Sequence, residues 1–173
     1  MDKRISEITM KMINYDKGDA ARIQHFIKVH NFAKVIGETE GLDEETQFIL
    51  EAAAVLHDIG IHKSEEKYNS CDGKYQEIEG PSEAEKLLKD IKGISEKEEE
   101  RICYLIAHHH TYTEISGMDY QILVEADFLV NLFEDPDLSG KAENIRENIF
   151  KTESGIKILD DMFLEKYDTN CNK

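Results

Sequence analysis

Residues 52–60 read AAAVLHDIG, in which five small or aliphatic residues lead into two adjacent polar residues, and a glycine ends the run. Burying His57 and Asp58 beside this apolar wall is costly unless another group pairs with them. A metal ion meets this need, because an imidazole and a carboxylate side by side offer two ligands at once. The stretch therefore predicts half of a metal site, and the other half must come from elsewhere in the chain.

The composition indicates one globular domain with an acidic surface. The chain has 173 residues, 40% of them hydrophobic, which is enough for one domain with a real core. The formal net charge of −16 argues against a general nucleic-acid binder and against docking on an anionic membrane. An acidic protein can still act on a small phosphorylated substrate if a metal supplies local positive charge.

Cysteine usage and the N-terminal sequence predict a soluble cytoplasmic protein. Cys71, Cys103 and Cys171 are far apart and form no CxxC pair, which is typical of a reducing compartment. The first residues are charged throughout and lack the apolar core of a signal peptide. No apolar run approaches the length of a membrane span.

Apolar residues recur at three- and four-residue steps along the chain, which predicts an all-α bundle of about six to eight helices. Asp19 and Asp43 are expected N-caps, and Gly41 is an expected C-terminal stop. We expect a single domain over residues 1–173, with its core at 19–134. An N-terminal helix within 1–17 and C-terminal helices within 138–167 complete it.

Residues 63–80 are polar and lack a clear period, so they are expected to form a long loop, and loops of this length often serve as lids. Pro81, with the capping-box pattern from Ser82 to Glu85, then predicts a helix start. Ser95 and Glu98 repeat this pattern. The 63–80 loop, the 111–118 loop and the C-terminal helices are the expected determinants of specificity.

Two further polar residues lie on apolar helical faces. His25 shares a face with Val29, Ala33 and Ile36, and Asp127 lies within the apolar run 122–133. Together with His57 and Asp58 they would give a shell of two imidazoles and two carboxylates, which suits Mn²⁺, Fe²⁺, Co²⁺, Ni²⁺ or Zn²⁺.

Each of these residues also has a structural interpretation. His25 could be a core histidine bonded to a backbone carbonyl. His57 and Asp58 could complete a helix C-terminus, where a histidine complements the helix dipole. Asp127 could pair with a buried arginine or lysine.

The order of these residues resembles that of the HD superfamily of metal-dependent phosphohydrolases. An isolated helical histidine, the AAxLHDIG pattern and an aspartate in an xADxL setting match the family over roughly residues 20–133. The resemblance implies the ligands His25, His57, Asp58 and Asp127. It also implies a helical bundle with a buried divalent metal, acting on phosphomonoesters, nucleotides or related substrates with a metal-activated water as nucleophile.

Three consecutive histidines, 108–110, need a separate interpretation. On a helix only His109 shares the face of Ile102, Leu105 and Ile106, and it resembles a pocket-lining histidine of many HD proteins. His108 and His110 are expected at the mouth of the pocket or in solvent, and a solvated cluster is the alternative. His30, five residues after His25, should point to nearly the opposite side.

The sequence departs from the family after the central motif, where many members continue HDIG with a lysine. Here Ile61, His62 and Lys63 follow, so no role is carried over to Lys63. Asp58 is expected to orient the attacking water, and His109 or His62 to hold the phosphate or protonate the leaving oxygen. Arg22 could reach a substrate phosphate or form a surface salt bridge.

Binuclear HD proteins use additional histidines before the last aspartate, and residues 63–107 contain none. We therefore expect one divalent ion per chain, with Mg²⁺ added to the candidates above.

The sequence thus predicts a phosphohydrolase acting on a small phosphate ester or nucleotide. The alternative is a non-catalytic helical sensor that binds a metal or nucleotide in the same pocket. A third interpretation, oxidative chemistry at a di-iron site, needs a second full ligand set. Homodimerisation through the C-terminal helices is left open.

Overall fold

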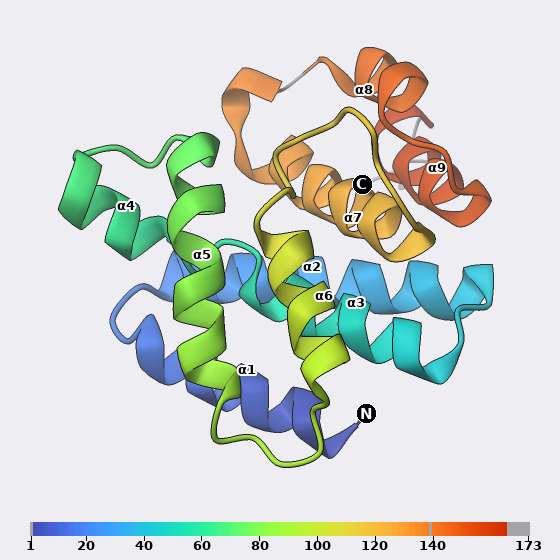
Figure 1. Cartoon of the computed structure of the whole chain (residues 1–173). Helices are drawn as coiled ribbons and strands as arrows, with labels where there is room; N and C mark the ends of the chain where they lie inside the picture. The colour runs from blue at the N-terminus through green and yellow to red at the C-terminus, as the bar shows by residue number, and fades with distance from the viewer. Residues whose placement is uncertain (1, 139, 166–173) are drawn as a thin grey trace, which may run out of the picture.

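Helix α2 (Ala20–Glu40) is the longest helix, and its ends are fixed by the expected residues. The Asp19 side chain accepts a hydrogen bond from the Arg22 amide at the N-terminus, and Gly41 adopts a left-handed conformation with φ of 77° at the C-terminus. Its buried face includes His25, Val29 and Ala33. Helix α2 packs against α3 and α7 and so forms the middle of the bundle (Figure 1).

The computed structural model describes residues 2–138 and 140–165, and all regular structure in this part of the chain is helical. The remaining elements, in chain order, are α1 (Lys3–Tyr15), α3 (Glu44–Leu56), α4 (Ile61–Tyr68), α5 (Gly73–Leu88), α6 (Glu96–Ile106), α7 (Met118–Glu134), a 3₁₀ turn (Pro136–Leu138), α8 (Ala142–Asn148), α9 (Glu153–Leu159) and a π-helical turn (Asp160–Leu164).

Helix α3 carries the central motif into the core. It begins at Asp43, whose side chain accepts from the amides of Glu45 and Thr46, and every residue from Phe48 to Leu56 is buried. Helix α3 contacts α1, α2, α6 and α7, so it is covered on all sides. This burial explains why residues 52–56 are apolar around the whole circumference of the helix.

The predicted all-α bundle is confirmed. The described residues contain nine α-helices, one more than the upper end of the expected range, because the segment 63–80 is helical. Helix α1 lies within the predicted 1–17 segment, and α8 and α9 lie within 138–167. Positions 1, 166 and 167 of these predicted segments lie outside the described residues.

The prediction of a long loop over residues 63–80 is wrong, because α4 and α5 fill it and leave only residues 69–72 as a link. The apolar period is missing for a physical reason. Helix α4 buries only Ile61 and Ser64, and the first half of α5 buries the polar residues Gln76 and Glu79. A pattern based on apolar residues does not detect a helix whose inner face is polar.

The predicted helix start at Pro81 is also wrong, because this proline lies inside α5. A proline within a helix costs about 3 kcal/mol, so contacts of α5 with its neighbours must offset that cost. Helix α5 packs against α4 and α6, beside which it runs in Figure 1. The second expected cap is confirmed, since Ser95 and Glu98 form a capping box at the start of α6.

The C-terminal helices are tied to α7 by a buried carboxylate. Glu125 is fully buried and accepts hydrogen bonds from the backbone amides of Lys151 at 2.6 Å and Thr152 at 3.0 Å. The Thr152 hydroxyl also donates to Glu125. This network fixes the start of α9 against the helix that carries Asp127.

None of the helices in residues 2–138 and 140–165 combines the length and the apolar character that a bilayer span requires.

Gly60 allows the turn after α3 to sit directly on α5. A Cβ atom placed on Gly60 would lie 2.6 Å from the amide nitrogen of Gly80 and 2.7 Å from the carbonyl oxygen of Gln76. Both are backbone atoms that cannot rotate away. The φ of Gly60 is −75°, so the need for glycine here is steric.

We therefore predict that Gly60→Ala lowers the free energy of unfolding by about 2 kcal/mol, because the helix backbone must move. Urea denaturation monitored by circular dichroism measures this change. Gly37→Ala, within α2, is the matched control. The nearest atom to its Cβ would be Oε1 at the end of the Gln47 side chain, and the flexible end of that side chain can move. Equal losses in the two variants would contradict the steric explanation.

Candidate metal centre

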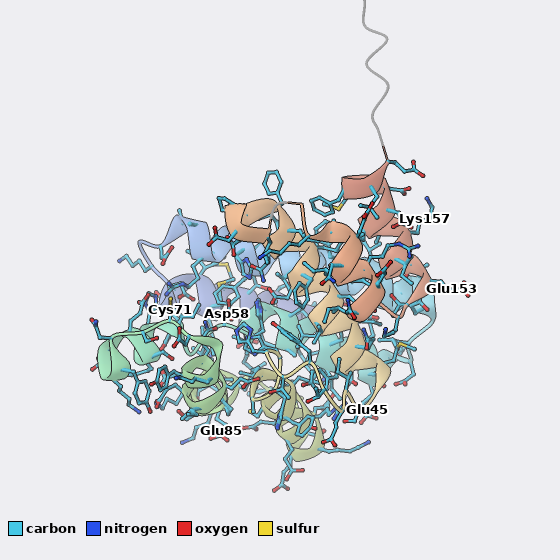
Figure 2. All side chains as sticks on the ribbon, turned by 90° about the horizontal axis from the view of Figure 1, so that it is seen from above. Glu45, Asp58, Cys71, Glu85, Glu153 and Lys157 are labelled. Atoms are coloured by element: carbon cyan, nitrogen blue, oxygen red, sulfur yellow. The ribbon has the colours of Figure 1, made fainter. Side chains whose placement is uncertain are left out.

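Three separate segments bring the four predicted ligands together. His25 comes from the middle of α2, His57 and Asp58 follow the last residue of α3, and Asp127 comes from α7. Residues 57–60 form a tight turn, with hydrogen bonds from Ile59 N to Leu56 O and from Ile61 N to Asp58 O. In Figure 2, Asp58 lies towards the middle of the molecule, whereas Glu153 and Lys157 lie at its edge.

The potential ligand atoms lie at the spacing of a coordination shell. His25 Nε2 is 3.2 Å from His57 Nε2 and 3.7 Å from Asp58 Oδ2, and His57 Nε2 is 3.6 Å from Asp58 Oδ2. Asp127 Oδ1 adds a fourth atom, 3.3 Å from His25 Nε2 and 3.5 Å from His57 Nε2. Ligands bound to one ion at about 2.0–2.2 Å are themselves separated by about 3.0–3.6 Å, which agrees with most of these distances.

Hydrogen bonds on the far side of each ring fix the tautomers. His57 Nδ1 lies 2.9 Å from the Ala54 carbonyl oxygen, and His25 Nδ1 lies 2.8 Å from Glu134 Oε2. Both partners only accept, so each Nδ1 carries a proton and each neutral ring presents a bare Nε2. These two lone pairs face each other and two carboxylate oxygens, so this set fits a bound cation.

The pKa values of the cluster show how the ion-free protein offsets the repulsion between these lone pairs and carboxylate oxygens. Burial opposes a charge on His25, but the Asp127, Asp58 and Glu134 carboxylates outweigh it and raise its pKa to about 9. Burial likewise opposes ionisation of Asp58 and Asp127, but the surrounding histidines hold the pKa of both well below its usual range. A proton on His25 thus supplies positive charge to this cluster in the ion-free protein.

The second oxygen of Asp58 belongs to another group of potential ligands. Asp58 Oδ1 lies 3.0 Å from His109 Nε2 and 3.7 Å from His110 Nε2. His109 is fully buried, and its Nδ1 lies 2.8 Å from the Ile106 carbonyl oxygen, so its Nε2 is also bare when the ring is neutral. Asp58 therefore lies between two sets of nitrogen atoms.

His110 joins this group although the sequence placed it at the mouth of the pocket or in solvent. Helix α6 ends at Ile106, and the turn 107–110 brings the rings of His109 and His110 to 4.0 Å from each other. Helical spacing does not apply in such a turn. His108 instead stacks on Tyr104 and lies 2.7 Å from its carbonyl oxygen.

The structure does not bring His62 into either group. It lies in the first turn of α4, where its ring contacts Asp16, Arg22 and Glu65. Its predicted role at the reacting phosphate therefore stays a prediction. His30 is also elsewhere, in a buried contact with Glu51 at 2.9 Å.

Two residues that the sequence reasoning missed complete the site. Asn131 Nδ2 donates to Asp127 Oδ1 at 2.9 Å, and Glu134 fixes the ring of His25. Both line the opening of the cavity together with His25 and Asp58. Asn131 and Glu134 follow Asp127 by four and seven residues, which places all three on one face of α7. This spacing could have identified them from the sequence.

Comparison with known families shows the family of the chain. A family model described as HD domain matches residues 22–152. The chain belongs to the HD domain family. The matched range contains all four predicted ligands, and HD domains are generally metal-binding hydrolases of phosphate esters. No curated protein and no solved structure matches the chain.

Glu134 offers a direct test of the metal site in this HD domain. Glu134→Gln keeps an acceptor for His25 Nδ1 but removes the charge that makes the ring a stronger ligand. We predict that affinity for Zn²⁺ or Mn²⁺ falls about tenfold, measured by competition with a chelator. Glu143→Gln, an exposed position on α8, is the control and should leave affinity unchanged. Unchanged affinity in Glu134→Gln would contradict a supporting role for the Glu134 charge behind His25.

The raised pKa of His25 predicts how the stability of the ion-free protein and its affinity for metal change with pH. The proton stabilises the ion-free fold fully below about pH 6.5, and this contribution is lost as the pH rises through 9. Metal binding displaces that proton, so affinity should rise about tenfold per pH unit between pH 7 and 9. Denaturation of the ion-free protein and chelator competition at several pH values measure both trends. A metal affinity that does not change between pH 7 and 9 would contradict the assignment of His25 as a ligand.

Proposed function

We propose that this HD domain is a metal-dependent phosphohydrolase acting on a small phosphate ester or nucleotide. The observation that carries this proposal is the group His25, His57 and Asp58, whose potential ligand atoms lie within 4.8 Å of one another beside an opening to solvent. Asp127 Oδ1 lies 3.3 Å from His25 Nε2 and 3.5 Å from His57 Nε2 and adds a fourth potential ligand. These four residues would hold a divalent ion. Such an ion supplies Lewis acidity, which lowers the pKa of water and offsets charge on phosphoryl oxygens.

The protein groups around this ion suggest how protons would move. Asp58 Oδ1 and His109 Nε2, 3.0 Å apart, form an acceptor pair beside the ligand atoms. Burial lowers the pKa of His109, so the ring is neutral at neutral pH and can accept a proton. We assign the orientation and deprotonation of the attacking water to this pair.

The number of ions is a separate part of the proposal. The four-residue group has a carboxylate behind His25 and a carbonyl behind His57, which are typical supports of metal ligands. We propose one ion per chain in this group. The three atoms of Asp58, His109 and His110 are the place where a second ion would bind.

Charge and composition restrict the partners that we propose. A net charge of −16 repels long nucleic acids and anionic membranes, so a small phosphorylated substrate is favoured. The three scattered cysteines support a cytoplasmic location. Homodimerisation stays an open prediction.

The proposal is tested with purified protein that is stripped of metal and then supplied with Mn²⁺, Co²⁺ or Mg²⁺. We expect hydrolysis of one member of a panel of nucleotides and phosphomonoesters. His57→Ala should lose both metal and turnover, whereas His109→Gln should retain one metal and lower kcat by about 10² to 10⁴. His108→Gln is the matched control, because this neighbouring ring contacts Tyr104 instead of Asp58.

Each part of the proposal has its own contradicting result. If no substrate is turned over and a nucleotide raises the thermal stability of the protein without being consumed, the sensor interpretation would be favoured over the enzyme. Two equivalents of metal in the wild type and one in His110→Ala would show that the second group is filled. Equal losses in His108→Gln and His109→Gln would exclude a specific role for His109.

A further inference from the structure

Arg22 lies at the opening of the cavity beside the metal ligands. It precedes His25 by one turn of α2, and Arg22, His25 and Asp58 line the same opening. Among the described residues that line it, Arg22 is the one arginine or lysine. A phosphate that enters this opening would therefore meet one guanidinium next to the ligand cluster.

The guanidinium of Arg22 is held differently from that of a structural arginine in the same chain. Arg101 contacts both carboxylate oxygens of Asp119, at 2.8 Å and 2.7 Å. The carboxylate contacts of Arg22 are longer and use one oxygen each, at 3.5 Å to Asp19 and 3.4 Å to Glu65. An arginine has five N–H donors, so these contacts leave donors for an incoming anion.

The shortest side-chain contact of Arg22 is with His62, at 3.1 Å between Nη1 and the ring Nδ1. The same Nη1 lies 3.4 Å from the ring Nε2, so the guanidinium lies against the face of the imidazole and not on the lone pair of one nitrogen. This Nε2 lies 3.0 Å from Asp16 Oδ1. His62 thus stands between a carboxylate and a guanidinium.

Asp16, at the end of α1, is the unusual member of this chain of contacts. Only 1% of it is exposed, and neither carboxylate oxygen has an aligned hydrogen bond in the described structure. Burial raises the pKa of Asp16, and the positive charges of His62 and Arg22 oppose that rise. A buried carboxylate that has the His62 ring at 3.0 Å but no aligned hydrogen bond is costly, so packing alone does not explain it.

We propose that Asp16 and His62 are positioning residues that hold the Arg22 guanidinium at the opening, where it binds the phosphate group of the substrate. The His62 ring, with Asp16 on one side of it, packs against the Arg22 guanidinium, and the remaining donors of Arg22 face the anion. This inference rests on the proposed function in taking phosphate as the ligand. It gives His62 a role through Arg22, away from the metal ligands.

The test uses inorganic phosphate as the probe, so it does not require turnover. Phosphate is titrated by calorimetry into the metal-loaded protein. Arg22→Gln should weaken phosphate binding about tenfold or more, the usual effect of losing a charge-assisted hydrogen bond. His62→Leu should weaken it several-fold, and His62→Gln should restore it, because a planar amide can still lie against the Arg22 guanidinium and donate to Asp16.

Lys63→Gln is the charge-matched control. Lys63 neighbours His62 on α4 and pairs with Glu66, so removing its charge should leave phosphate binding unchanged. Metal content should be equal in all variants. With a substrate from the panel, His62→Leu should raise KM and leave kcat nearly unchanged, a separation that general destabilisation would not give.

Three outcomes overturn the inference. They are no phosphate binding by the wild type, unchanged binding by Arg22→Gln, and binding by His62→Gln as weak as that by His62→Leu. If no substrate is hydrolysed but phosphate binding still depends on Arg22 and His62, the proposed enzyme fails and this inference stands.

Discussion

The Nε2 atoms of His25 and His57 lie 3.2 Å apart inside the bundle, and neither neutral ring has a proton to place between them. One oxygen of Asp58 and one oxygen of Asp127 each lie within 3.7 Å of both nitrogen atoms. Four acceptors in a low-dielectric interior repel one another unless a positive charge lies among them. A proton on His25 meets this need in the ion-free protein, and a divalent cation would meet it more fully because it carries a larger charge.

Helix ends hold this set of acceptors in place. His57 follows the last residue of α3 and donates to the carbonyl of Ala54, and His109 follows the end of α6 and donates to the carbonyl of Ile106. In both cases the acceptor lies three residues back, in the last turn of the helix. The bond uses a carbonyl that the helix leaves free and fixes the ring tautomer. The negative ends of both helix dipoles also lie near the site, which favours a cation.

Much of this arrangement follows from the sequence, because the ligands lie on helices with strong apolar faces. Periodicity placed His25 on the buried face of α2 and Asp127 inside α7, and the apolar run of α3 required its two polar residues to be buried. The position of His110 could not be predicted in this way. It depends on where α6 ends, and helical geometry stops applying at that residue. Glu134 was also missed, because a carboxylate at the end of an amphipathic helix is usually solvated.

The failed prediction for residues 63–80 has the same physical origin as the site itself. Helix α5 buries Gln76, whose side-chain oxygen lies 3.3 Å from His110 Nε2, and the neighbouring Glu77 accepts from the backbone amide of His110 at 3.0 Å. Glu77 also accepts from the Thr111 hydroxyl at 3.0 Å. The inner face of this helix is polar because it supports the turn that carries His109 and His110. A rule that equates buried faces with apolar residues therefore fails where a helix packs against a site and not against the core.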